Sequence, residues 1–345
     1  MELNEPALLA DGIKPLHSFA AEVRTGLNSN LLAFCLRPLA DYDSVPALAN
    51  RLNVLGIKSK ADFASYQAGL AALVAKEIEA IPPGVTQLIL SGETLANIRP
   101  REIRAIRRLF IPHCDEFLIV YYVRRQDHYV RSKYSTDLRN SRLKDFGIHF
   151  LGHQGWHRGQ YDVLIARWAD EFGADAIRPR IFSSEDLYQG DVVADFFKLL
   201  GSSAVGKVGA STRINVAASA VAQCWHLAFL EAVKETPLAK PSNPLNQRFR
   251  RILEKTFEGP AFAPTQAEAR DLLESFAESN ERLRQRWFPE REAVFSSDVS
   301  AYSETRSLDG YLSRENRQRL IESLQTKLKN EPEARNKLVS VIESL

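Results

Sequence analysis

Residues 117–141 read Phe-Leu-Ile-Val-Tyr-Tyr-Val-Arg-Arg-Gln-Asp-His-Tyr-Val-Arg-Ser-Lys-Tyr-Ser-Thr-Asp-Leu-Arg-Asn-Ser, and this stretch decides the fold class. It opens with an unbroken apolar and aromatic run, which is typical of a strand buried on both faces. Arg124 and Arg125 follow where the run stops, and the segment after them, which contains Ser132, predicts a helix. Open α/β sheets bind anions where a strand ends and leads into a helix. The stretch therefore predicts an anion site at the end of a buried strand.

The segments on either side of this stretch alternate between strands and helices. Val85–Ser91 predicts a second buried strand, and the helix Pro100–Phe110 follows it. Farther along, the helix Gln160–Phe172 precedes a third strand, Ala176–Phe182. This alternation is the order that builds a parallel sheet with helical crossovers. We therefore expect an α/β core with a short parallel sheet.

After about Ile214 the pattern contains helices only. Apolar residues at helical spacing predict four helical segments, Ile214–Val233, Asn246–Phe257, Gln266–Trp287 and Arg314–Leu345. The last of them is charged and amphipathic, which fits either a helix pair that caps the core or an oligomer contact. We predict two domains: an α/β nucleotide-binding core over residues 1–213 and a helical region packed on it over residues 214–345.

Composition limits the classes of function. The 345 residues include 45 Lys and Arg and 43 Asp and Glu, a formal net charge of +2. This balance predicts no general binding of nucleic acids, so any basic site is local. The three cysteines are few and far apart, which excludes a disulfide scaffold and favours a reducing compartment. Without a membrane-spanning apolar run or a signal-peptide pattern, we expect a soluble, cytoplasmic protein.

The two strand-end arginines allow two interpretations. In the first, Arg124 and Arg125 lie at an exposed strand end and pair with carboxylates such as Asp127. In the second, the planar guanidinium of Arg124 binds a phosphate group bidentately, together with the Ser132 hydroxyl and nearby backbone N–H groups. Residue types alone leave both interpretations open.

The spacing of Arg124 and Ser132 resembles the 3′-phosphate-binding motif of sulfotransferases that use PAPS (3′-phosphoadenosine 5′-phosphosulfate), and is most similar to that of bacterial sulfotransferase-like proteins. In that family the arginine ends a strand, the serine lies on the next helix, and both bind the 3′-phosphate of the donor. Further segments resemble the family in order and spacing, namely 88–93, 161–173, 181–187, 195–201, 276–281, 287–288 and 294–295. The resemblance covers nearly the whole chain.

The resemblance implies a parallel-sheet core like that of P-loop NTPases, followed by an all-helical C-terminal region. It also implies that the protein is a transferase, moving a sulfuryl group from PAPS to a hydroxyl of a glycan or small-molecule acceptor without a metal. Arg124 and Ser132 are then the donor-binding residues. Two alternatives stay open: a catalytically inactive sulfotransferase-like binding protein, and another nucleotide-dependent transferase such as a glycosyltransferase.

One element of the family has no counterpart in this sequence. Sulfotransferases begin with a strand and a loop of the Lys-Thr-Gly-Thr-Thr kind, which binds the 5′-phosphosulfate through backbone N–H groups and a lysine. Here Asn4–Ile13 resembles the segment that follows that loop. We expect either a chain that starts one strand late or a degenerate member, and we predict sulfotransferase activity only if a phosphate loop is encoded upstream.

Sulfuryl transfer requires a base that accepts the proton of the acceptor hydroxyl. The resemblance assigns Glu93 to this role, because some sulfotransferases use a glutamate and Glu93 follows a predicted strand. In the alternative interpretation Glu93 is a helix-capping carboxylate ahead of Leu95. Ser91 is a further candidate for contact with the nucleotide or the acceptor.

Two other segments carry motifs of lower specificity. Gly201–Val208 has the glycine and Gly-Lys spacing of a Walker A loop, but Val208 stands where a Ser or Thr would bind magnesium, and no strand precedes it. We predict a loop that ends the preceding helix.

His149, His153 and His157 are spaced by four, which would align metal ligands only on a helix. Because Ser141–Gly159 is rich in glycine, we predict a loop there instead of a helix, and no metal. Its Trp156 is expected to stack on the sugar face of an acceptor. The helix Arg99–Arg108 is rich in arginine, which is typical of a solvated face.

Overall fold

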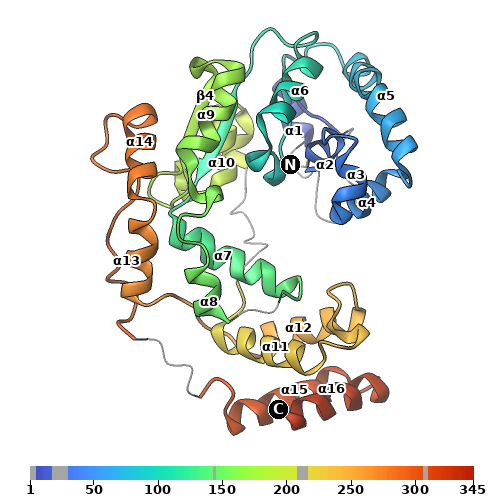
Figure 1. Ribbon diagram of the computed structural model, residues 1–345, viewed down its shortest axis with the longest axis vertical. Coiled ribbons are helices and arrows are strands. Elements are labelled where there is room, and N and C mark those ends of the chain that lie inside the picture. Colours follow the sequence, from blue (N-terminus) through green and yellow to red (C-terminus); the bar gives the residue numbers. More distant parts are fainter. Residues whose placement is uncertain (1–4, 18–29, 143–144, 208–216, 306–309) are drawn as a thin grey trace. The chain divides into compact units, whose positions relative to one another are not determined.

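A computed structural model describes residues 5–17, 30–142, 145–207, 217–305 and 310–345 (Figure 1). The chain divides into two compact units. Unit 1 comprises Met1–Val123 and Tyr161–Thr212, and unit 2 comprises Arg124–Gln160 and Arg213–Leu345. Among the described helices, none combines the length and the apolarity that crossing a membrane requires.

Unit 1 holds the strands that the structure describes. β1 (Ile13–Pro15) pairs in parallel with β2 (Gln87–Ile89), and β3 (Ile119–Val123) pairs in parallel with β4 (Ile177–Ile181). The expected mixed α/β class and its parallel strand pairing are confirmed. Within the described ranges the strands form two separate pairs, and the short β1 was missing from the sequence prediction.

Helices cover both strand pairs of unit 1. They are α1 (Glu5–Ala10), α2 (Asn30–Cys35), α3 (Asp41–Ser44), α4 (Pro46–Leu52), α5 (Lys60–Glu79), α6 (Pro100–Phe110), α9 (Tyr161–Phe172) and α10 (Val192–Leu199). α5 begins at a capping box in which the Ser59 hydroxyl accepts a hydrogen bond from the Asp62 backbone N–H at 3.0 Å. The predicted helix Pro100–Phe110 is confirmed as α6.

A buried carboxylate links the two strands of the β3–β4 pair. Asp195, on α10, accepts hydrogen bonds from the Tyr122 hydroxyl of β3 at 2.8 Å and from Nε of Arg180 on β4 at 3.0 Å. It also accepts one from the Tyr188 backbone N–H. Burial raises the pKa of Asp195, but the hydrogen bonds from Arg180, Tyr188 and Tyr122 outweigh it and leave that pKa lowered. The carboxylate is therefore held charged, and it ties α10 to the sheet.

Unit 2 is helical throughout its described residues. Its helices are α7 (Gln126–Arg139), α8 (Phe146–Leu151), α11 (Ala220–Ala232), α12 (Pro244–Thr256), α13 (Gln266–Glu274), α14 (Ala277–Trp287), α15 (Arg314–Lys327) and α16 (Pro332–Ser344). The segment Gln266–Trp287 was predicted as one helix, but it breaks at Ser275 and Phe276. The break turns the Phe276 ring into the core, where it is 2 % exposed.

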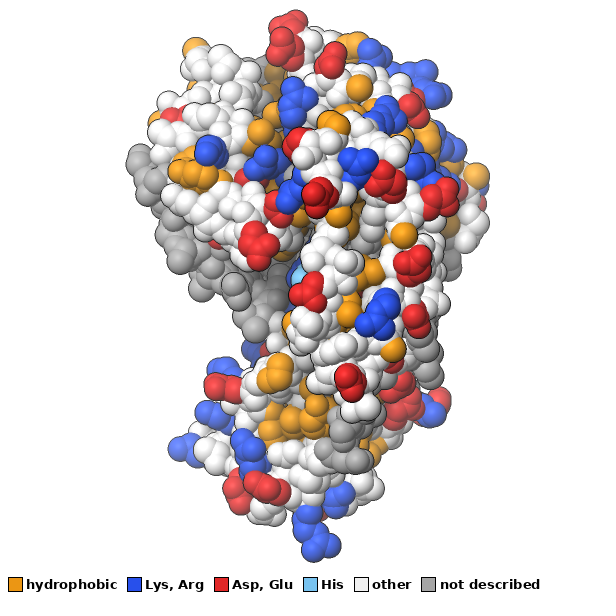
Figure 2. All heavy atoms as spheres, turned by 90° about the vertical axis from the view of Figure 1, so that its left-hand side faces the viewer, with side chains coloured by type: hydrophobic (Ala, Val, Ile, Leu, Met, Phe, Trp, Pro, Cys, Tyr) orange, Lys and Arg blue, Asp and Glu red, His pale blue; other side chains and the backbone are white. Residues whose placement is uncertain are grey.

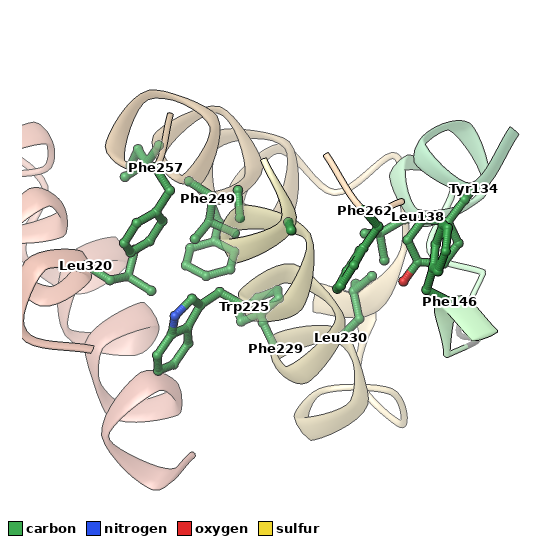
Figure 3. Packing of buried hydrophobic residues seen from close by; sticks show 14 of the residues in the cluster. Tyr134, Leu138, Phe146, Trp225, Phe229, Leu230, Phe249, Phe257, Phe262 and Leu320 are labelled. Atoms are coloured by element: carbon green, nitrogen blue, oxygen red, sulfur yellow. The ribbon is translucent and has the colours of Figure 1, made fainter. Parts of the chain in front are cut away.

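One large apolar cluster fills unit 2 (Figure 3). The rings of Phe229 and Phe249 lie 4.2 Å apart between their centroids, and Leu320 from α15 joins them. The charged C-terminal segment is thus a helix pair that caps this core. Tyr134 of α7 and Phe146 of α8 belong to the same cluster.

The apolar face of α7 explains why residues 124–160 group with unit 2. Val130, Tyr134 and Leu138 recur at helical spacing and are at most 3 % exposed, all within the large cluster. The sequence prediction had grouped this segment with the α/β core over residues 1–213. Helices α11 and α13, which contact α7, lie more than 80 residues farther along the chain, and a local pattern does not reveal them.

Gly159 packs so closely on Phe276 that a side chain does not fit. A Cβ atom at this position would lie 2.6 Å from Cε1 and 2.7 Å from Cζ of the ring. Because the ring is buried, we expect Gly159→Ala to lower the free energy of unfolding by about 1–3 kcal/mol, measured by urea denaturation.

Gly69→Ala, in the middle of α5, is the matched control. No atom lies within 4 Å of a Cβ built at Gly69, and alanine is the better helix former. We expect this change to raise the free energy of unfolding by about 1 kcal/mol. An equal loss of stability in both variants would contradict the packing explanation.

Candidate functional site

The connection between β3 and α7 consists of Arg124 and Arg125. β3 ends at Val123, and α7 begins at Gln126 with Arg125 as its N-cap residue. Asp127 lies in the first turn, where a negative charge interacts favourably with the helix dipole. The predicted order of strand, arginine pair and helix is confirmed, but β3 is only partly buried: Tyr121 and Val123 are buried, and the other residues of the strand are half-buried, so the expected burial on both faces was wrong.

Arg125 is occupied by contacts within unit 2. Its Nε and Nη2 donate to the two carboxylate oxygens of Asp127 at 2.8 and 2.7 Å, and its Nη1 donates to the Asp298 carbonyl oxygen at 2.9 Å. Asp127 is fully buried and also accepts a hydrogen bond from the Tyr302 hydroxyl at 2.6 Å. Burial raises the pKa of Asp127, but hydrogen bonds from Arg125 and Tyr302 outweigh it and leave that pKa lowered. For Arg125, the interpretation as a paired arginine is confirmed.

Gln126 holds the same end of α7 from its other side. The side chain is 1 % exposed, and its amide nitrogen donates to the Gly159 carbonyl oxygen at 3.1 Å and to Oδ1 of Asn280 at 2.7 Å. Since α14 supplies Asn280, buried hydrogen bonds fix the start of α7 against segments far apart in the chain.

Arg124 and Ser132 both belong to unit 2. Arg124 is half-buried, and Ser132 is exposed on α7. The helical period of 100° per residue puts Ser132 on the same face as Tyr129 and Thr136, opposite the buried apolar stripe. The hydroxyl of Ser132 makes no hydrogen bond with another described residue. The two predicted donor-binding residues are thus on one connected element, with the serine accessible.

Glu93 lies in unit 1, as the first residue of the 3₁₀-helix η3 (Glu93–Asn97) that follows β2. Its carboxylate is exposed and forms no hydrogen bond or ion pair with the described residues. The start of η3 is instead held by Asn30, whose Oδ1 accepts from the Thr94 backbone N–H at 2.9 Å and from the Thr94 hydroxyl at 2.8 Å. Because Glu93 is in the other unit, its proximity to Arg124 stays a prediction.

The histidine-rich segment contains a helix, which corrects the predicted loop. α8 forms over Phe146–Leu151 although the segment is rich in glycine. Phe146 stacks on Phe262 with 5.3 Å between ring centroids, and Phe150 is fully buried, so aromatic packing outweighs the low helix propensity of glycine. His149 therefore lies on a helix.

The three histidines differ in their surroundings. His149 and His153 are buried, with 4.4 Å between their ring centroids, and His157 is exposed. Within the described parts of the chain, no three His, Cys, Asp or Glu side chains are grouped as a metal site. Trp156 stacks on Tyr129 of α7 with 5.8 Å between centroids.

The loop that resembles a Walker A motif contains the 3₁₀-helix η7 (Ser203–Lys207), and an internal carboxylate occupies its start. Asp11 accepts hydrogen bonds from the hydroxyls of Ser202 and Ser203 at 2.6 and 2.8 Å, and from the Ser203 backbone N–H at 2.9 Å. Hydrogen bonds from both serines lower the pKa of Asp11. These donors are already satisfied, which agrees with the predicted structural role. Val208 lies outside the described residues.

Two arginines of the basic helix α6 form ion pairs within unit 1. Arg99 contacts Asp41 at 2.8 Å and the buried Glu102 at 2.7 Å, and Arg104 contacts Glu171 of α9 at 2.8 Å. On the face drawn in Figure 2, positive and negative side chains are interspersed. Any basic site on this face is therefore local, as the composition suggested.

Comparison of the chain with models of protein families, with curated proteins and with solved structures finds no match.

The sequence prediction missed a group of polar residues on α11 and α12. Gln223 and His226 are buried, at 2 % and 4 % exposure, and they are one turn apart in an otherwise mostly apolar helix. Two polar residues at this spacing within such a helix are the indication that could have revealed the group.

The buried His149 makes the stability of unit 2 depend on pH. Burial, with a contribution from the neighbouring His153, lowers the pKa of His149 to about 4. Because an unfolded histidine has a pKa of about 6.5, the unfolded chain binds the proton first as the pH falls. Burial of the neutral His149 therefore costs no stability above pH 6.5. Between pH 6.5 and pH 5 the free energy of unfolding falls by about 2 kcal/mol, because the unfolded chain takes up a proton that the folded chain does not.

Urea denaturation at about pH 7.5 and about pH 5 measures this loss. His149→Phe keeps an aromatic ring without the titrating group, so we expect its loss of stability to be smaller by about 2 kcal/mol. His157→Phe, at an exposed position of the same segment, is the control and should behave as the unmodified chain. A loss that is the same in all three proteins would contradict the role of His149.

Proposed function

We propose that Arg124 and Ser132 bind the 3′-phosphate of a PAPS-type nucleotide and that the chain acts as a sulfotransferase-like protein. The observation that carries the proposal is the order of parallel strand, arginine pair and helix, with Ser132 accessible on the helix. Strand ends that lead into helices are where α/β folds bind anions.

The contacts of Arg125 disfavour it as a ligand-binding residue. Every guanidinium nitrogen of Arg125 donates to a protein oxygen, on Asp127 or on the carbonyls of Ser296 and Asp298. Moving Arg125 to a ligand would leave the buried Asp127 carboxylate uncompensated, which costs several kcal/mol. Arg124 carries the second guanidinium at the same strand end.

The reach between Arg124 and Ser132 also supports the proposal. Ser132 lies six residues into α7 from Gln126, which corresponds to about 9 Å along the helix axis. An arginine side chain directed along the helix, with a phosphate group beyond it, spans a distance of this order. Serine and arginine then supply neutral and charged donors to different phosphate oxygens.

Calorimetric titration with 3′,5′-ADP tests the donor site. We expect binding by the unmodified chain, and a loss of about tenfold to a hundredfold in affinity for Arg124→Ala, because a hydrogen bond to a charged group contributes about 1.5–3 kcal/mol. Ser132→Ala should weaken binding by a smaller factor. Adenosine 5′-monophosphate, which lacks the 3′-phosphate, should bind weakly to all three proteins.

Thr136→Ala is the matched control for Ser132→Ala. Both hydroxyls lie on the exposed face of α7, one turn apart. We expect Thr136→Ala to bind 3′,5′-ADP as the unmodified chain does. If a folded unmodified chain binds no 3′,5′-ADP, the nucleotide site and the sulfotransferase proposal both fail.

Glu93 is the proposed base of the transfer step. The acceptor oxygen bonds to sulfur while the bond from sulfur to the 5′-phosphate oxygen breaks, which gives a sulfate ester and 3′,5′-ADP. The proton of the acceptor hydroxyl passes to the Glu93 carboxylate, which is exposed and forms no hydrogen bond or ion pair with the described residues. The lysine-bearing loop that binds the 5′-phosphosulfate in the family has no counterpart in this sequence.

Transfer of labelled sulfate from PAPS to glycan acceptors tests the reaction. We expect Glu93→Gln to lower kcat by about a hundredfold to ten-thousandfold while the affinity for 3′,5′-ADP is unchanged, because only the proton acceptor is lost. Binding of 3′,5′-ADP without any transfer by the unmodified chain would favour the inactive binding protein instead. Equal kcat for Glu93→Gln would remove Glu93 as the base.

A further inference from the structure

A polar pocket lies between α7, α11 and α12 of unit 2, away from the proposed nucleotide site at the start of α7. Most of the space of about 280 Å³ between its lining side chains is open solvent at the mouth, and the enclosed part has room for about one water or hydroxyl oxygen. Arg139, Arg250 and Glu254 line it as charged groups, and the buried Gln223 and His226 line it as neutral ones. Two guanidinium groups and one carboxylate leave the pocket with a net positive charge.

The carboxylate of Glu254 lacks a hydrogen bond that its position requires. Oε1 is buried and has no hydrogen-bond partner, while Nε of Arg139 lies 3.8 Å away and Nη1 of Arg250 lies 3.9 Å away. These distances are too long for hydrogen bonds. A single hydroxyl group can bridge such a gap: its oxygen accepts a hydrogen bond from the arginine at about 2.8 Å, and its proton is donated to the carboxylate at about 2.7 Å. When these two bonds meet near a right angle, the arginine nitrogen and the carboxylate oxygen lie about 3.9 Å apart. The gap therefore matches one bridging hydroxyl group.

His226 also lines the pocket, and the hydrogen bonds of its neighbour Asn246 fix the tautomer of its ring. Its Nε2 lies 3.2 Å from Oδ1 of Asn246, and the amide nitrogen of Asn246 donates to the carbonyl oxygens of Ala239 and Lys240. Oδ1 is thus the acceptor, Nε2 is the donor, and Nδ1 keeps a lone pair with no partner among the described residues. Burial lowers the pKa of His226 to about 4, so the ring is neutral near pH 7.

We propose that this pocket binds a small phosphate-class oxyanion through Arg139 and Arg250, with a P–OH group of the ligand donating to Glu254. Inorganic phosphate, which keeps at least one P–OH group near pH 7, supplies both the negative oxygens that guanidinium groups prefer and the hydroxyl that the carboxylate requires. Sulfate has the same shape but carries no hydroxyl near neutral pH, so it would bring lone pairs against the Glu254 carboxylate. The pocket is therefore expected to discriminate between the two anions.

Calorimetry of the full chain with inorganic phosphate and with sulfate, near pH 7 and at low ionic strength, tests the proposal. We expect phosphate to bind more tightly than sulfate by about tenfold or more, and Arg250→Ala to weaken phosphate binding by a similar factor. Arg251→Ala is the matched control, because Arg251 is exposed on α12 and does not line the pocket. It should keep the phosphate affinity within about twofold.

Glu254→Gln changes the preference in a way that a purely structural role would not. The glutamine amide supplies an N–H donor in place of the carboxylate, so we expect sulfate to bind more tightly than it does to the unmodified chain. Circular dichroism checks that each variant is folded. If Arg250→Ala does not fold, two other measurements test the proposal: the phosphate affinity of Arg139→Ala, and the ratio of phosphate to sulfate affinity in the unmodified chain.

Three results would overturn the proposal and leave a bridging water as the only group in the pocket. They are an absence of phosphate binding, equal affinity for phosphate and sulfate, or equal effects of Arg250→Ala and Arg251→Ala. Arg124→Ala separates this site from the proposed nucleotide site. Phosphate binding should survive in Arg124→Ala, and 3′,5′-ADP binding should survive in Arg250→Ala, so that either site can fail alone.

Discussion

The buried ion pair between Arg125 and Asp127 is the interaction on which the arrangement of α7 depends. A carboxylate removed from water is tolerated only when charge and hydrogen bonds replace its solvation, and Asp127 has both, from Arg125 and from the Tyr302 hydroxyl. Since Tyr302 comes from a segment near the C-terminal end of the sequence, this contact anchors the first turn of the helix. The direction of α7 then decides which of its side chains are buried and which are available to a ligand.

α7 carries a candidate anion site near each end, and the two ends differ electrostatically. At its start, backbone N–H groups and the helix dipole favour an anion, so one arginine and one serine suffice for the proposed nucleotide contact. At its end the dipole disfavours an anion. The pocket there combines Arg139 with Arg250 from α12, and this second guanidinium offsets the unfavourable dipole. Between the two ends, the apolar stripe of α7 joins the large cluster of unit 2.

Much of the fold follows from local pattern, and the exceptions share one cause. The helix α6 and the strand β3 were predicted within two residues, because apolar spacing and capping residues lie inside the segments themselves. The helix α8 was missed because its glycines disfavour a helix locally, whereas the burial of Phe146 and Phe150 stabilises it through distant partners. The break between α13 and α14 was missed for the same reason, since it is stabilised by burial of the Phe276 ring among residues that are distant in the sequence.

The sequence by itself determined the strand-to-helix connection with its two arginines and the spacing of Arg124 and Ser132, because both are encoded within a few adjacent turns. Only the tertiary structure decided that Arg125 is held by contacts within unit 2. Its partner Asp127 is fixed by Tyr302, which lies 175 residues farther along the chain. The pocket at Glu254 was likewise beyond sequence analysis, since its charged and polar groups come from three helices that meet only when the chain is folded.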